Sequence, residues 1–260
     1  MAQHAVVTGA ASGLGRAIAD LLRADGWRLA LVDLPGERWP EAVPAGDLAV
    51  AFDVRDGAAW RDLHERLRGA WPALDLVVNA AGVGAAGEVG TLAEEQWRRV
   101  VETNLIGTAL GCETFVPWLR EHPRRSHLLN VASISAAVGL PTLAAYAASK
   151  AGVVALSEAI AAECPRGRPS VTIACPGFFR SGLLDTWHFA SEVAAREAGR
   201  RMTTTKRSAA LIARRALAAT WRGRRYAVVG LRARLLWGLA GVAPRLATAL
   251  VRRRYARLVG

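Results

Sequence analysis

Short apolar runs alternate with amphipathic segments along most of the chain. The apolar runs lack regular polar alternation, which is typical of strands that have helices packed on both faces of their sheet. Repeated strand–helix units with short connections predict an α/β fold with a parallel, doubly wound sheet. The predicted strands span residues 4–8, 28–33, 48–54, 74–79, 127–132, 170–175 and 226–229. The predicted helices span residues 14–25, 60–70, 146–163 and 208–220, and residues 94–105 begin a further, long helix.

Two regions depart from this alternation. Residues 181–207 lie between the last two predicted strands, and residues 231–260 follow the last one. No repeat and no low-complexity linker divides the sequence. We therefore expect a single domain over residues 1–230, followed by a C-terminal extension over residues 231–260.

The composition predicts a folded protein with a large core, because 52% of the 260 residues are hydrophobic and 22% are charged. Three cysteines without paired spacing favour a reducing compartment. The first residues run directly into a predicted strand, so we expect a cytoplasmic protein without a secretory signal. The five histidines show no ligand spacing, and no metal site is predicted.

The formal net charge of +12 would suit a nucleic acid, an anionic ligand or an anionic membrane surface. Arginine supplies nearly all of this charge, since Lys150 and Lys206 are the only lysines. The sequence has no recognition-helix pattern, no zinc-finger spacing and no aromatic–basic stacking surface. We therefore expect no nucleic-acid partner.

A glycine-rich segment, TGAASGLG, connects the first predicted strand to the first predicted helix. Its glycines allow a tight turn and a close approach of the backbone to a pyrophosphate, and the helix directs free N–H groups and its dipole at that anion. Three glycines are a weak signal alone, but their place between a strand and a helix strengthens it. A purely structural turn is the alternative. The predicted contacts with a dinucleotide are Gly9, Ser12, Gly13, Leu14 and Gly15.

Asp33 ends the second predicted strand, eighteen residues after the last glycine of that loop. A carboxylate there accepts hydrogen bonds from the ribose hydroxyls of an adenosine and repels a 2′-phosphate, which favours NAD over NADP. Arg16 and Arg38 keep a phosphate site open as the alternative. Asp53 and Val54 end the third predicted strand, where they would lie near the adenine. A capping role of Asp53 for the next helix is equally compatible with its position.

Tyr146 and Lys150 begin a predicted helix four residues apart, so the phenol and the ammonium can face one site. A free phenol has a pKa of about 10, which is too high for an efficient base near neutrality. A nearby ammonium stabilises the phenolate, so we expect Lys150 to lower the pKa of Tyr146. A lysine in a chain that otherwise uses arginine indicates that the compact ammonium is required.

Further residues lie at the ends of predicted strands or in the helices that follow, where open α/β sheets bind ligands. Ser133 lies thirteen residues before Tyr146, and its hydroxyl can hold a substrate oxygen beside the phenol. Ser135 competes with it, because alternate residues of an extended segment point the same way, but the spacing to Tyr146 favours Ser133. The other candidates at this edge are Asn79, Gly82, Asn104, Pro176 and Gly177.

Six motifs occur here in the order found in short-chain dehydrogenases/reductases, and the chain resembles that family over about residues 4–230. They are TGAASGLG, NAAG, the Asn of ETNLIG, Ser133, YAASK and PG. The resemblance implies a Rossmann-like fold and an NAD(P)-dependent enzyme that acts on CH–OH groups. It implies that Tyr146 is the acid/base and that Lys150 lowers its pKa and binds the nicotinamide ribose. It also implies that Ser133 orients the carbonyl and that Asn104 supports a water relay.

The same resemblance implies that residues 181–207 cover the substrate and that family members self-associate, so we expect a homo-oligomer. Ser181 replaces the usual threonine and keeps a hydroxyl that can reach the nicotinamide carboxamide. Phe178, Phe179 and Trp187 favour a lipophilic substrate. Ordinary packing of this lid on the sheet is the alternative.

Residues 231–260 combine ten uncharged residues, from Leu235 to Pro244, with arginines on both sides. A helix of that length cannot span a bilayer, which takes about 20 residues, but a basic, partly apolar helix can lie in a membrane interface. The alternatives are a subunit interface and a cover over the substrate pocket. Gly238, Gly241 and Pro244 favour these two, because they weaken a continuous interfacial helix.

The sequence therefore predicts an oxidoreductase that transfers a hydride between NAD(H) and a secondary alcohol or ketone, which is expected to be lipophilic. A non-catalytic dinucleotide-binding regulator on the same fold is the second hypothesis. An incomplete Ser–Tyr–Lys set would favour that regulator, whereas the set is complete here. A membrane-associated scaffold, suggested by residues 231–260 alone, is the third.

Overall fold

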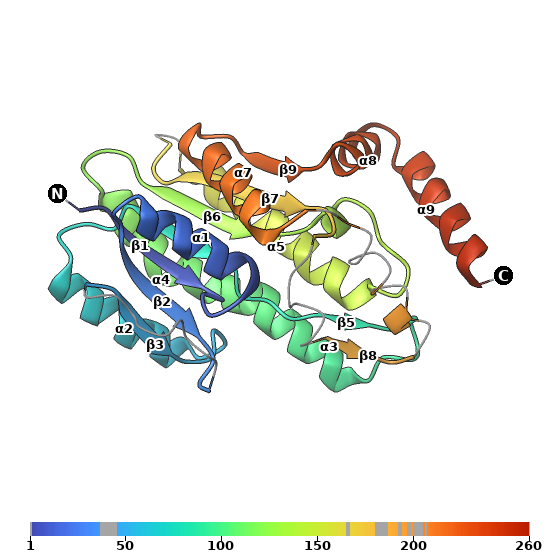
Figure 1. Cartoon of the computed structure of the whole chain (residues 1–260), viewed down its shortest axis with the longest axis horizontal. Coiled ribbons are helices and arrows are strands. Elements are labelled where there is room, and N and C mark those ends of the chain that lie inside the picture. The colour runs from blue at the N-terminus through green and yellow to red at the C-terminus, as the bar shows by residue number, and fades with distance from the viewer. Residues whose placement is uncertain are drawn as a thin grey trace.

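The computed structural model describes residues 2–36, 46–164, 167–179, 187–191, 194–196, 199, 205 and 207–259 (Figure 1). Three sequence-based expectations fall on residues outside these ranges. They concern Arg38 as a phosphate ligand, Ser181 as a carboxamide contact, and most of the lid over residues 181–207.

The centre of the molecule is a seven-stranded sheet whose strands are all parallel to their neighbours. The strand order is β3-β2-β1-β4-β6-β7-β9 (Figure 1). Successive strands are thus added toward one edge of the sheet from β1 to β3, and toward the other edge from β4 to β9. This reversal opens a crevice at the carboxyl ends of the strands. The predicted doubly wound sheet is confirmed. Its strands are β1 (His4–Thr8), β2 (Arg28–Asp33), β3 (Leu48–Ala51), β4 (Leu76–Asn79), β6 (His127–Val131), β7 (Ser170–Pro176) and β9 (Tyr226–Val229).

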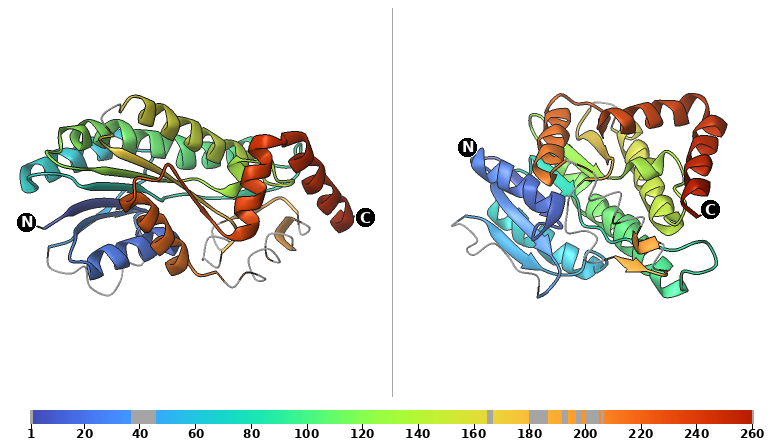
Figure 2. Two further views of the ribbon diagram at one scale, coloured as in Figure 1. Left: turned by 90° about the horizontal axis from the view of Figure 1, so that it is seen from above. Right: turned by 45° about the vertical axis from the view of Figure 1, so that its right-hand side comes forward.

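Helices cover both faces of the sheet and bury two separate apolar layers (Figure 2). α1 (Gly13–Ala24) and α7 (Ala209–Trp221) pack on one face. α2 (Gly57–Ala70), α4 (Gly107–Glu121) and α5 (Ala144–Ala162) pack on the other. Successive residues of β1 serve opposite layers: Val7 lies in the first and Val6 in the second. Burial of both faces explains why the strands read as unbroken apolar runs.

Several boundaries differ from those predicted. β3 ends at Ala51 rather than at residue 54, because it is an edge strand from which the chain turns away. α2 begins at Gly57, since the Asp56 carboxylate accepts hydrogen bonds from the first-turn amides of Ala58 and Ala59. Asp56 is thus the cap, and the capping role considered for Asp53 is wrong.

The long helix predicted to begin over residues 94–105 is present, but a π-helical turn interrupts it. α3 (Glu94–Val101) passes through a π-helical turn (Glu102–Ile106) and continues as α4. π-turns of this kind accommodate an extra residue and are frequent at functional sites. Here the turn contains Asn104.

Short elements that the sequence did not predict lie beyond the carboxyl end of the sheet. β5 (Ala85–Ala86) pairs in parallel with β8 (His188–Phe189), and a single 3₁₀ turn (Ile134–Ala136) follows β6. The extension forms α8 (Leu231–Val242) and α9 (Pro244–Val259), which make one end of the molecule (Figure 1). Pro244 is well placed at the first position of α9, where no backbone N–H is needed. Within the described ranges, no helix is long and apolar enough to cross a membrane.

Candidate active site

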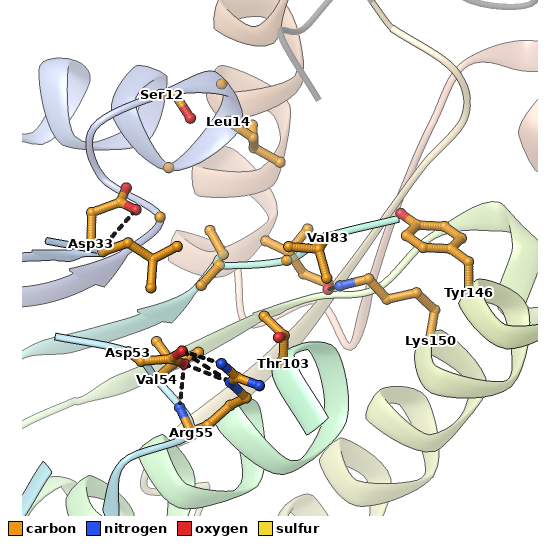
Figure 3. Close-up of a pocket in the computed structure, with 18 of the residues that line it drawn as sticks. Ser12, Leu14, Asp33, Asp53, Val54, Arg55, Val83, Thr103, Tyr146 and Lys150 are labelled. Carbon is orange, nitrogen blue, oxygen red and sulfur yellow. Dashed lines mark hydrogen bonds and ion pairs between the residues drawn. The ribbon is translucent and has the colours of Figure 1, made fainter. Parts of the chain in front are cut away.

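One groove runs along the carboxyl end of the sheet from β2 to the start of α5, and we call it the cofactor groove (Figure 3). Asp33 and the glycine loop lie at one end, and Tyr146 and Lys150 lie at the other. The predicted site residues that line it are Gly9, Ser12, Gly13, Leu14, Gly15, Asp33, Asp53, Val54, Gly82, Tyr146, Lys150 and Pro176.

The glycines of the loop after β1 meet different steric demands. Gly9 and Gly13 have φ of 65° and 55°, which favour glycine. A Cβ on Gly15 would lie 2.2 Å from the Gly9 carbonyl oxygen, so only glycine lets α1 approach the strand this closely. A Cβ on Gly13 would meet no atom within 4 Å, which leaves its backbone open at the N-terminus of α1. This open backbone with free helical N–H groups fits a pyrophosphate.

The Asp33 carboxylate is held at the end of β2 by two backbone amides. One oxygen accepts a hydrogen bond from Ala11 N at 2.8 Å, and the other accepts from Leu34 N at 2.9 Å. The first bond ties the carboxylate to the glycine loop, so the expected ribose and pyrophosphate contacts would be positioned together. Each carboxylate oxygen retains lone-pair capacity for a further donor.

Asp53 is engaged by Arg55, which the sequence analysis did not single out. The guanidinium contacts both carboxylate oxygens, with Nη2 2.6 Å from Oδ2, and its Nη1 lies 3.5 Å from Glu102 (Figure 3). These hydrogen bonds from Arg55 lower the pKa of Asp53. Val54 lines the same end of the groove, and its carbonyl accepts a hydrogen bond from Trp60 Nε1.

Asn79 does not belong to the described lining of the cofactor groove, although the sequence predicted a cofactor contact. Its amide donates to Asn130 Oδ1 at 2.8 Å and to Cys112 Sγ at 3.4 Å. Asn130 in turn donates to Ser157 Oγ at 2.9 Å. The side chain therefore joins β4 to β6 inside the core, since Asn79 and Asn130 are direct partners in the sheet.

Asn104 is fully buried in the π-turn and fixes the loop after β4. Its Oδ1 accepts from Val83 N at 2.8 Å, and its Nδ2 donates to Val83 O at 3.0 Å and to Ser149 Oγ at 3.0 Å. A Cβ on Gly82 would lie 3.1 Å from Asn104 Oδ1 and 3.4 Å from Lys150 Nζ. The water relay implied for Asn104 stays a prediction, and its side chain holds Gly82 beside the lysine.

Ser133, Tyr146 and Lys150 converge where β6 and α5 meet. Ser133 and Tyr146 line the same hollow, and hydrogen bonding from Ser133 acts to lower the pKa of Tyr146. Lys150 Nζ donates to Val131 O at 2.9 Å and lies 5.9 Å from the centroid of the Tyr146 ring. The ammonium is thus held below the phenol on the groove side of α5 (Figure 3).

Burial dominates the acid–base properties of this pair. Desolvation raises the pKa of Tyr146 to about 12, although the hydrogen bond with Ser133 opposes it. This burial opposes the lowering expected from Lys150 and a bound nicotinamide, and the lowered pKa stays a prediction for the protein with its cofactor. Desolvation also lowers the pKa of Lys150 to about 8, while the neighbouring Cys175 thiol raises it. Cys175 was not expected near the site.

Ser133 and Ser135 have different surroundings, because Ser133 precedes a 3₁₀ turn and Ser135 lies within it. Ser133 caps that turn, and its Oγ accepts a hydrogen bond from Ser135 N at 3.2 Å. Ser135 Oγ is buried and has no hydrogen-bond partner among the described residues. The hydrogen bond with Tyr146 favours Ser133 as the residue beside the phenol.

A second hollow, which we call the substrate chamber, adjoins the Ser133–Tyr146 pair. The Trp187 ring lies 5.4 Å from the Tyr146 ring, centroid to centroid. Gly84 makes this possible, because a Cβ there would lie 1.9 Å from Trp187 Cε2. Gly84 was not predicted from the sequence, where its only signal was its place just after NAAG. The chamber is lined by Ser133, Ile134, Ser135, Leu140, Leu143, Tyr146, Pro176, Gly177, Phe178, Phe179 and Trp187.

Among curated proteins, two relatives illustrate the likeness. The Lentilactobacillus kefiri protein named "NADP-dependent (R)-specific alcohol dehydrogenase" is 30% identical over 196 residues, 73% of this chain and 78% of that protein. The Mycobacterium tuberculosis protein named "Probable oxidoreductase EphD" is 33% identical over 189 residues, 70% of this chain and 32% of that protein. The chain therefore spans about a third of the length of EphD.

Solved structures agree in fold over nearly the whole chain. A short-chain dehydrogenase/reductase from Burkholderia phymatum in complex with NAD is similar with a TM-score of 0.85 and 25% identity over 95% of each chain. A short-chain dehydrogenase from Streptomyces avermitilis gives 0.84 and 25% over 98% of each chain. The sequence profile of the short chain dehydrogenase family matches residues 3–190. The chain therefore belongs to the short-chain dehydrogenase/reductase family of oxidoreductases.

Proposed function

We propose that the chain is an NAD-dependent oxidoreductase that interconverts a secondary alcohol and a ketone. One observation carries this proposal: Ser133, Tyr146 and Lys150 meet at the point where the cofactor groove and the substrate chamber join. A regulator that only binds a dinucleotide would need the groove but not this convergence.

A bound nicotinamide supplies the hydride acceptor for oxidation and the hydride donor for reduction. In oxidation, the Tyr146 phenolate would take the proton of the alcohol O–H, and the carbon that bears this oxygen would lose a hydride, so that a ketone forms and the phenol holds the proton. In reduction, the phenol returns that proton to the carbonyl oxygen. Ser133 donates a hydrogen bond to the substrate oxygen, and the Lys150 ammonium stabilises the phenolate.

The preference for NAD rests on Asp33, whose carboxylate lines the groove and would repel a 2′-phosphate. Two arginines near this end are already engaged: Arg55 with Asp53, and Arg16 with Asp20 at 3.9 Å. Relatives differ in cofactor, since the Lentilactobacillus kefiri protein is named as NADP-dependent and the Burkholderia phymatum structure holds NAD. Comparison of kcat/KM for the two cofactors tests this preference, and a wild-type preference for NADP contradicts it.

The apolar substrate chamber supports a lipophilic substrate. Leu140, Leu143, Phe178 and Trp187 surround the space beside the phenol.

We further propose that the chain is divided into one domain over residues 1–230, which includes a lid over residues 181–207, and an extension over residues 231–260. We also propose that the chain forms a homo-oligomer, and gel filtration with light scattering tests this by measuring the mass of the particle in solution.

Reduction of NAD in the presence of lipophilic secondary alcohols tests the function, with Tyr146→Phe as the decisive variant. We expect this variant to lose about 10²–10⁴-fold in turnover, because general acid–base catalysis is lost. Its NAD affinity should be nearly unchanged, since the glycine loop and Asp33 are intact. Wild-type turnover in the variant removes Tyr146 from the mechanism, and NAD binding without any turnover by the wild type favours a regulator.

The pH dependence of both directions gives an independent test. Oxidation needs the phenolate, so its rate should rise with pH toward the pKa of Tyr146, whereas reduction needs the phenol and should fall above that pKa. The positive nicotinamide ring of NAD⁺ should bring the apparent pKa below the value of about 12 that burial produces. Lys150→Met should raise it again, and an unchanged pH profile contradicts the role of Lys150.

A further inference from the structure

A third hollow, which we call the outer cavity, lies between the sheet end and the helices α8 and α9. Its volume of about 590 Å³ falls within the range of roughly 300–1,000 Å³ that small-molecule sites occupy. Leu231 and Leu236 of α8 and Val251 of α9 contribute apolar walls. Figure 2 shows how these two helices form one end of the molecule. The extension therefore encloses space that the sheet alone would leave open.

The outer cavity continues the substrate chamber. Ile134, Leu140, Gly177 and Phe178 line both spaces. The first two belong to the loop that begins with Ser133, and the other two follow β7. A ligand whose reacting carbon lies at Tyr146 can thus extend past these residues into the outer cavity.

Three arginines line the outer cavity: Arg207, Arg232 and Arg254. In the part of the chain that the structure describes, none of them forms an ion pair, whereas Arg23 and Arg55 are paired with aspartates. Three cations that have no ion-pair partner among the described residues, beside an apolar space, repel one another and attract an anion. Guanidinium groups suit a carboxylate or a phosphate, which they can bind through two parallel hydrogen bonds.

The start of the extension is built around one of these arginines. Gly230, with φ of 111°, precedes α8, and a Cβ on it would lie 2.8 Å from Arg207 Cζ. A side chain at residue 230 would therefore displace the guanidinium from its place. Leu231, Arg232 and Ala233 follow at once and line the cavity. The position of Arg207 and the direction of α8 thus depend on the same glycine.

We propose that the outer cavity binds an anionic group, a carboxylate or a phosphate, at the far end of an apolar substrate. The reacting alcohol or ketone occupies the substrate chamber, the apolar chain passes Leu140 and Phe178, and the anion contacts Arg207, Arg232 and Arg254. The identity of the reacting end rests on the proposed function, whereas the anion site rests on the outer cavity itself. The extension then selects the substrate.

Three ketones of equal chain length test this proposal: one ends in a methyl group, one in a carboxylate and one in a phosphate. With the wild type we expect kcat/KM for at least one anionic ketone to exceed that for the methyl ketone by about tenfold, as charge-assisted hydrogen bonds contribute that much. The better of the two anionic ketones identifies the head group. Equal values for all three ketones overturn the proposal and leave the proposed function intact.

Arg254→Gln and Arg207→Gln should remove the advantage of the anionic ketone and leave kcat/KM for the methyl ketone unchanged. Arg253→Gln is the matched control, because Arg253 is the neighbouring exposed residue of α9, does not line the cavity and carries the same charge. The control should keep the full advantage. An equal loss in Arg253→Gln and Arg254→Gln means that net charge alone attracts the anion, which overturns a specific site.

Calorimetric binding of the same ketones to Tyr146→Phe protein with NAD separates the two proposals. Tighter binding of the anionic ketone, lost in Arg254→Gln, supports the outer cavity as an anion site even if no ketone is turned over. Absence of turnover by the wild type would then count against the proposed function alone. Equal affinity for the anionic and methyl ketones overturns the anion site.

Discussion

The cofactor groove and the substrate chamber meet at Tyr146 but are built in different ways. Backbone geometry forms the groove: glycines permit the close approach of α1 to β1, and backbone groups fix the side chains of Asp33 and Asn104. Side chains from separate segments form the chamber and the outer cavity, among them Trp187 and Arg254. The groove therefore tolerates little change, whereas the chamber can change its lining without disturbing the sheet.

This difference separates chemistry from selection. Under the proposed function, hydride and proton transfer would depend on groups held at the end of the sheet, while the choice of substrate would depend on residues carried by loops and by the extension. Loops on a rigid scaffold are common places for binding residues to vary. Variants that damage the cofactor groove and spare the substrate chamber, or the reverse, show whether these two halves of the site are independent.

Gly15→Ala should damage the groove most. Its Cβ would lie 2.2 Å from the Gly9 carbonyl oxygen, so the backbone must move, at a cost of about 3 kcal/mol in the free energy of unfolding. NAD binding should be lost as well. Gly13→Ala is the comparison variant: its Cβ meets no atom within 4 Å, so it should lose about 1 kcal/mol from its left-handed backbone and weaken NAD binding. Chemical denaturation and NAD titration measure both, and equal stabilities contradict the steric argument.

Lys150→Met should stabilise the protein at pH 7 while it impairs turnover. Burial lowers the pKa of Lys150 from 10.5 to about 8, so below pH 8 the folded protein holds a charge that burial disfavours. Removal of that charge should raise the free energy of unfolding by about 3 kcal/mol. The gain should shrink as pH rises from about 8 toward 10.5, because the lysine of the wild type then folds uncharged. A gain that is constant over this pH range argues against a buried charge.

Asp33→Ser should change cofactor choice without affecting the chamber. Removal of the carboxylate should raise the ratio of kcat/KM for NADP to that for NAD by about tenfold, since the repulsion of a 2′-phosphate is lost. The KM for the alcohol, measured at saturating cofactor, is the control and should not change. A large rise in that KM would mean that the two halves are coupled.

Gly84→Ala should affect the chamber and spare the groove. Its Cβ would overlap Trp187, so the indole must leave its place beside Tyr146. We expect the KM for a lipophilic substrate to rise about fivefold, as overpacking costs about 1 kcal/mol here. The NAD dissociation constant should stay constant. Weaker NAD binding in this variant would contradict the separation of the two halves.

The groove could be predicted from sequence because each of its parts lies within one short segment of the chain. A glycine loop between a strand and a helix, a carboxylate at a strand end, and Tyr146 and Lys150 four residues apart each take their geometry from one element. Asn79 shows the limit of this local reasoning: its place at a strand end was visible, but its partner across the sheet, Asn130, was not.

The chamber and the outer cavity could not be predicted, because they depend on contacts between distant segments. Arg207, Arg232 and Arg254 are three arginines among many in the sequence, and only folding brings them to one cavity. The raised pKa of Tyr146 also escaped prediction, since burial of a helix start cannot be inferred from its own residues. The four-residue spacing indicated that Tyr146 and Lys150 lie close together, but not how far their surroundings exclude water.

The position of α8 and α9 in the chain has a consequence for synthesis. The strands that shape the cofactor groove lie within the first 176 residues, whereas Val251 and Arg254 come much later. At about 5–20 residues per second, the ribosome makes the groove-forming strands several seconds before these residues emerge. A ligand that binds only the folded state stabilises it by mass action, so a dinucleotide in the groove would favour folding of a nascent chain whose outer cavity does not yet exist.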